Sequence, residues 1–163
     1  MSEELGFNVY KVNMGGKAHR YVSPLPMAIV AKHGLVAEAI VGEVTGDAEG
    51  VTSENFKANP AFIKFLQWSI SRNVQECKEI QEEAKKVGDG NIIVPDFRQP
   101  AEDGSILQED VIGLVEVKNG KIVLFHASPD YIPFTEKGFM ILDSFFKDRH
   151  EADLLAHIAK QVR

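Results

Sequence analysis

The sequence predicts an α+β fold: an antiparallel sheet of about five strands, with one long helix packed on a face and a C-terminal helix. Three observations support this class. One apolar stripe runs through residues 60–87, a strong hairpin signal is centred on Asn119-Gly120, and no strand–helix–strand alternation repeats along the chain. A parallel sheet would need that alternation, so antiparallel pairing is expected.

The long helix is expected to begin at Pro60 and to end before Gly88. Asn59 suits the N-cap, and Pro60 suits the first helical position, where its missing N–H costs no hydrogen bond. Gly88 lies where a left-handed C-cap belongs. Between them, apolar side chains recur at steps of three and four residues, which places them on one face of a helix. These residues are Phe62, Leu66, Ile70, Val74, Cys77, Ile80, Ala84 and Val87.

Two hairpins are expected. Residues 111–118 and 121–127 flank Asn119-Gly120, a pair typical of the type I′ turn, in which both central residues have positive φ. Near the N-terminus, residues 7–12 are expected to pair with residues 18–22 across a turn at Met14-Gly15-Gly16. The other expected elements are a helix at 27–33 ended by Gly34, strands at 37–44, 91–95 and 139–142, and a C-terminal helix that starts at Asp143 or Asp148.

Length and composition indicate a folded protein with its own core. The chain has 163 residues, and residues 1–163 are expected to form a single globular domain. Cys77 is the one cysteine, so no intrachain disulfide can form and the cytoplasm is the expected compartment. The first residues are acidic, unlike a signal peptide, and no apolar run reaches the roughly 20 residues that a membrane helix needs.

The charge balance limits the classes of partner that are expected. The formal net charge is −6, from 18 basic and 24 acidic residues, and no basic run stands out. Generic binding to nucleic acid depends on lysine and arginine that neutralise phosphates, and binding to anionic membranes has the same requirement. Neither is therefore an expected partner. The expected partner is a second copy of the chain or another protein, and no cofactor is expected.

The first half of the long helix is apolar on more than one side. Phe65 and Trp68 fall well away from the main stripe, with Ala61 between them. Either the N-terminal segment covers this second surface, or the surface is an interface, since aromatic anchors are typical of interface cores. The leading hypothesis is a non-catalytic domain that associates with itself or with a partner through Phe65, Trp68 and Ala61.

Two short stretches carry a pattern of catalytic type. Asp96 follows Pro95 at the end of an expected strand, and Glu116 and Lys118 share a face of another strand. This pattern resembles the PD-(D/E)xK nuclease motif, in which an acidic pair holds a divalent metal. The resemblance covers residues 95–118 and implies that Asp96 and Glu116 are metal ligands and Lys118 the catalytic lysine. A metal-dependent nuclease is therefore the third hypothesis.

A purely structural interpretation of the same residues has more support. Lys118 adjoins the hairpin turn, where charged residues are expected, and a long loop separates Asp96 from the hairpin. Glu116 and Lys118 are then the solvated face of a strand whose Val115 and Val117 face inward.

His126 ends a strand and is followed by Asp130 and Tyr131. An imidazole at a sheet edge can act as a general base, so His126 and Lys118 are the candidate catalytic residues. His126, Asp130 and Tyr131 can also line a pocket between sheet and helix. A small-ligand-binding domain is therefore the alternative to association, and the balance leans away from an enzyme.

Overall fold

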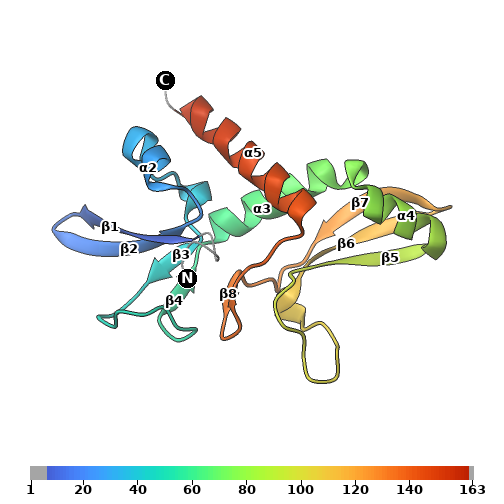
Figure 1. Ribbon diagram of the computed structural model, residues 1–163, viewed down its shortest axis with the longest axis horizontal. Helices are drawn as coiled ribbons and strands as arrows, with labels where there is room; N and C mark the ends of the chain where they lie inside the picture. Colours follow the sequence, from blue (N-terminus) through green and yellow to red (C-terminus); the bar gives the residue numbers. More distant parts are fainter. Residues whose placement is uncertain (1–6, 162–163) are drawn as a thin grey trace. The chain divides into compact units, whose positions relative to one another are not determined.

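The computed structural model describes residues 7–161, and the predicted α+β class is confirmed (Figure 1). The prediction of one sheet of about five strands is wrong in detail, because the strands form antiparallel sheets of four, three and two strands. Contacts between residues divide the chain into two compact units. Unit 2 comprises Leu66–Ile132 and Met140–Asp153, and unit 1 comprises the other described residues. The single-domain expectation for residues 1–163 stays a prediction.

Unit 1 is built on the four-stranded sheet, whose strand order is β1-β2-β3-β4. β1 (Asn8–Met14) and β2 (Lys17–Ser23) form the hairpin that the sequence predicts. Gly15 and Gly16 occupy its turn with φ values of 59° and 82°, a conformation that glycine adopts without a steric cost. β3 (Gly42–Val44) and β4 (Phe56–Ala58) complete the sheet, and β4 lies where no strand is predicted.

α2 (Met27–His33) ends at Gly34, whose φ is 76°, as predicted. The strand predicted at 37–44 is wrong over its first half, because Ala37–Ala39 form a 3-10 turn and only Gly42–Val44 are extended. The reason is a long-range contact. The side-chain amide of Asn59 donates to the carbonyls of Ala37 and Ile40, at 2.8 and 2.9 Å, and so satisfies them outside a strand ladder.

Two apolar clusters lie in unit 1. α5 (Ser144–Gln161) contributes Leu154 and Ile158 to a buried cluster with Leu25 and Ala39, against which Ile29, Val30, Leu35, Val36 and Phe65 pack. A second cluster is aromatic. It includes Phe56 and the rings of the short pair β8 (Phe134–Thr135) and β9 (Gly138–Phe139).

Gly42→Ala is expected to lower the free energy of unfolding by about 1–3 kcal/mol, the usual cost of overpacking. A Cβ at Gly42 would lie 2.3 Å from the Phe56 ring and 2.5 Å from the carbonyl oxygen of Lys57. That carbonyl belongs to the strand paired with β3, so it cannot move aside freely. Urea unfolding measures the effect. Gly50→Ala is the control, since a Cβ there meets nothing within 4 Å, and equal midpoints for the two variants would contradict this packing.

Unit 2 contains the three-stranded sheet, in the order β5-β6-β7. β6 (Val111–Lys118) and β7 (Lys121–Ala127) form the predicted hairpin, with Asn119 and Gly120 at φ 52° and 74°. β5 (Gly90–Pro95) pairs with β6, and α4 (Lys78–Val87) lies on one face of the sheet and contacts all three strands (Figure 1).

The single long helix predicted from Pro60 to Gly88 is wrong in its middle. α3 (Pro60–Asn73) is followed by a 3-10 turn, and Cys77 is extended before α4 begins. Asn73 explains the break, because its side chain donates to the carbonyl of Ser69, four residues back, and to the carboxylate of Asp153, at 2.7 and 3.0 Å. Such local bonds compete with helix continuation.

The predicted ends of this segment are confirmed. The Asn59 side chain accepts a hydrogen bond from the Ala61 amide at 3.2 Å, and the Gly88 amide donates to the Ala84 carbonyl. At the C-terminal helix, Asp143 is the confirmed cap, since its carboxylate accepts from the Phe145 amide at 3.1 Å. Among residues 7–161, no helix combines the length and the apolar composition that crossing a membrane requires.

Candidate functional site

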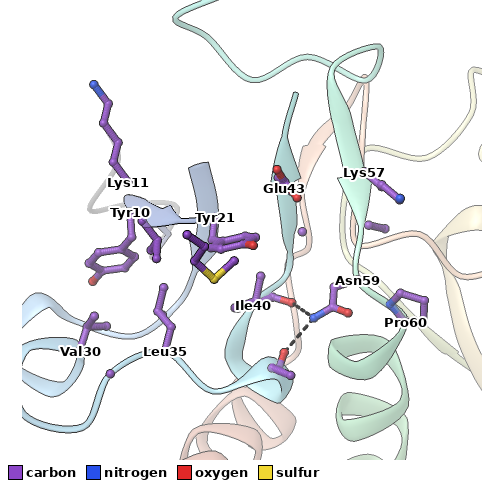
Figure 2. Close-up of a pocket in the computed structure, with 16 residues that line it drawn as sticks. Tyr10, Lys11, Tyr21, Val30, Leu35, Ile40, Glu43, Lys57, Asn59 and Pro60 are labelled. Carbon is purple, nitrogen blue, oxygen red and sulfur yellow. Dashed lines mark hydrogen bonds between the residues drawn. The ribbon is translucent and has the colours of Figure 1, made fainter. Parts of the chain in front are cut away.

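A cleft of about 720 Å³ lies in unit 1, between one face of the β1–β4 sheet and the chain that follows α2 (Figure 2). This volume is within the range of about 300–1,000 Å³ that is typical of ligand sites. Tyr10 and Tyr21 lie on its sheet side, and Val30, Leu35 and Ile40 lie on the opposite wall. The cleft is therefore apolar at its centre.

Strand register determines which side chains face the cleft. Tyr10, Tyr21, Glu43 and Lys57 are cross-strand partners, so they form one row on the same face of the four strands. Val12 and Met14 follow Tyr10 at steps of two along β1 and share this face. Four short strands thus bring into one row residues that span positions 10 to 57.

Hydrogen bonds hold the polar groups of this face. The Tyr10 hydroxyl donates to the Leu25 carbonyl at 2.6 Å, and burial raises the pKa of the phenol, which keeps this donor protonated. His19 Nδ1 lies 2.9 Å from Glu43 Oε2, and its ring stacks on Tyr21 with a centroid separation of 5.8 Å. The two carbonyls that receive the Asn59 amide belong to the opposite wall. Asn59 therefore joins the end of β4 to the opposite wall of the cleft.

The cleft is lined by residues between Tyr10 and Pro60, and the acidic residues of this stretch all follow position 37. Residues 7–37 contain Lys11, Lys17, Arg20 and Lys32 and neither aspartate nor glutamate, although the net charge of the chain is −6. Lys11 and Lys57 lie at the rim and extend away from the centre of the cleft in Figure 2. Glu43, the one carboxylate of the lining, is paired with His19. The charged residues of the lining are therefore two lysines and one carboxylate that is paired with a histidine.

The structure separates the residues predicted as an interface. Phe65 packs against the buried cluster of unit 1, with its ring 5.2 Å from that of His157, so α5 of the same chain covers it. Trp68 is 49% exposed, and the Arg72 guanidinium lies over its ring at 5.1 Å. Ala61 is half-buried. Association through these residues stays a prediction that rests on Trp68 alone.

The predicted pocket of His126, Asp130 and Tyr131 is brought together in part. His126 and Asp130 line a small depression of about 230 Å³ in unit 2, and His126 Nε2 lies 2.9 Å from Glu116 Oε1. Tyr131 is absent from this lining because it points inward, where its hydroxyl donates to Asp96 at 2.7 Å.

The structure does not bring the nuclease-like residues together. Glu116 pairs with Asn91, five residues before Asp96, which corresponds to about 16 Å along a strand. Lys118 is exposed next to the hairpin turn. Across residues 7–161, no three histidine, cysteine, aspartate or glutamate side chains form a group that could hold a metal ion.

Asp96 instead belongs to a buried ion cluster in unit 2. Its carboxylate lies 3.3 Å from Arg98 Nε, and Arg98 Nη2 lies 2.9 Å from Asp110 Oδ1. Burial raises the pKa of Asp96, against the lowering effects of the Ile141 amide, the Arg98 guanidinium and the Tyr131 hydroxyl. Burial and the neighbouring Asp96 charge raise the pKa of Tyr131 well above its ordinary value, so its hydroxyl stays a donor.

The cleft residues were missed at the level of sequence. Tyr10, Tyr21, Glu43 and Lys57 are spread over four strands, one of them unpredicted, and they form no local motif. The run of residues 7–37 without an acidic side chain is the one signal that points to this region. No protein-family model, curated protein or solved structure shows a significant match to the chain.

Proposed function

We propose that the chain is a non-catalytic binding protein, and that the cleft of unit 1 holds a ligand with an apolar body and a negative charge. The observation that carries this proposal is the apolar cleft of about 720 Å³, whose rim carries Lys11 and Lys57 while its carboxylate, Glu43, is paired with His19. Three polar residues of the lining, Tyr10, Glu43 and Asn59, already make hydrogen bonds within the fold, which favours binding over catalysis.

The dye 1-anilinonaphthalene-8-sulfonate is a suitable first probe, because it joins apolar rings to one sulfonate. Val12→Trp should weaken its binding about tenfold or more, a loss of about 1.4 kcal/mol, since the indole would fill space beside Tyr10. Fluorescence titration measures this affinity. Asn13→Trp is the matched control, because the next residue along β1 faces the other side of the sheet and is exposed.

The charge preference is tested by an uncharged analogue, N-phenyl-1-naphthylamine. The sulfonate dye should bind more tightly than this analogue. Lys57→Gln should reduce the difference in affinity between the two compounds. Equal dye affinities for Val12→Trp and Asn13→Trp would exclude the cleft as the binding site. Circular dichroism must first show that each variant is folded, since 1-anilinonaphthalene-8-sulfonate also binds partly unfolded chains.

A further inference from the structure

We infer that the ligand of the cleft is an extended peptide segment with alternating apolar and acidic side chains, which binds by adding a strand to the free edge of β1. This inference rests on the proposed function and names the class of its ligand. β1 is an edge strand: β2 lies on one side, and no strand lies on the other in the part of the chain that the structure describes.

The register identifies the open backbone groups. In a hairpin with a two-residue turn, the residues that flank the turn bond to each other, so Met14 and Lys17 form a bonded pair and every second residue of β1 points its N–H and C=O toward β2. The backbone N–H and C=O groups of Val9, Lys11 and Asn13 then point to the open edge of β1. The carbonyl of Val22, the partner of Val9, accepts from Val41 on the β3 side, which agrees with this phase.

The cleft lies on the face of β1 that an added strand would extend. Side chains of an added strand alternate between the two faces of the sheet, in register with those of β1. Every second side chain would therefore lie beside Tyr10 and Val12, over the apolar cleft. Backbone bonds to the edge and side chains in a pocket are the two components of peptide recognition by strand addition.

The other side chains of the added strand would lie beside Lys11. Val9, Lys11 and Asn13 alternate along β1 with Tyr10 and Val12, so their side chains point to the other face of the strand, and all three are exposed, Lys11 at the rim of the cleft. Directly opposed charges of opposite sign stabilise a strand pair, whereas like charges destabilise it. Lys11 is the charged residue of these three, so acidic side chains fit beside it and basic ones do not.

The probe is a fluorescein-labelled peptide, Thr-Val-Glu-Leu-Glu-Val-Thr, read by fluorescence anisotropy. A peptide of the same composition with its glutamates adjacent is the sequence control. N-methylation of one alternate set of backbone amides should abolish binding, and N-methylation of the other set should leave it within about twofold, because a strand bonds to its neighbour through alternate residues. Equal sensitivity of the two sets would overturn strand addition.

Two variants of Lys11 separate the edge from its charge. Lys11→Gln removes the side-chain charge and keeps the backbone N–H, and it should weaken binding of the glutamate peptide severalfold. Lys11→Pro also removes the outward N–H, which an edge strand tolerates, and it should weaken the peptide further. If Lys11→Pro fails to fold, Val9→Pro removes another outward donor of the same edge. Peptide affinity equal to that of Lys11→Gln in a folded proline variant would contradict the inference.

The dye and the peptide distinguish the two proposals. Dye binding that depends on Val12, without peptide binding, keeps the proposed function and overturns strand addition. If neither the dye nor the peptide binds, both the proposed function and strand addition are overturned. A concentration-dependent dimer that Lys11→Pro dissociates would show that a second copy pairs with β1, which also contradicts a foreign acidic segment as the occupant. Sedimentation velocity reads this last outcome.

Discussion

Arg98→Met is expected to lower the free energy of unfolding by about 3–5 kcal/mol, the cost of removing one partner from a buried ion pair. The Arg98 side chain is fully buried, with 0% of its surface exposed, and it lies between the carboxylates of Asp96 and Asp110. It also donates to the Ile132 carbonyl at 2.6 Å. Methionine fills much of the volume but leaves both carboxylates buried without their cation.

The position of this ion cluster explains why the effect should be large. The Asp96 carboxylate also accepts from the amides of Arg98 and Ile141, at 3.2 and 2.9 Å, and from the Tyr131 hydroxyl. The ends of β5 and β6 and the segment before α5 are therefore joined at one residue.

Arg72→Met is the matched control for Arg98→Met. The Arg72 side chain is 54% exposed and lies 3.8 Å from Asp153, so its loss should cost at most about 1 kcal/mol. Tyr131→Phe removes one bond to Asp96 and should cost about 1–3 kcal/mol. Urea unfolding at neutral pH gives all three values. A cost for Arg98→Met no larger than that for Arg72→Met would show that the cluster contributes nothing to stability.

Local signals in the sequence were sufficient where short-range physics determines the structure. Asn119-Gly120 predicted a turn that both positive φ values confirm, and Asn59 and Gly88 predicted the outer ends of the α3–α4 segment. These features depend on neighbours a few residues away, so a sequence pattern contains most of the information.

Long-range partners explain what the sequence could not show. The α3–α4 break depends on the bond from Asn73 to Asp153, 80 residues further on. In the sequence, Asp96 next to Pro95 resembles a metal ligand, whereas in the structure its carboxylate contacts Arg98 and Tyr131. The cleft is a row across four strands, and no pattern within any one strand indicates it. A comparison of charge between the N-terminal segment and the whole chain could have shown its location.

Acidification from pH 6.5 to about 4 is expected to cost about 3 kcal/mol of stability through His150 alone. Burial lowers the pKa of this imidazole from 6.5 to about 4, although the nearby Asp153 charge opposes the shift. Between these pH values the unfolded chain binds a proton that the folded chain does not. Stability therefore falls as the pH falls through 6.5, and this loss is complete below about 4.

Asp96 works in the opposite direction at the acidic end. Its pKa is raised in the folded chain, so the folded state takes up this proton first as the pH falls, which offsets part of the loss from His150. The comparison with His150→Gln isolates the histidine, because Asp96 is common to both proteins. Urea unfolding at a series of pH values should show that the wild type loses about 3 kcal/mol more than His150→Gln between pH 7 and pH 4. Parallel profiles for the two proteins would mean that His150 titrates alike in the folded and unfolded chain, and that its burial on α5 does not hold it neutral.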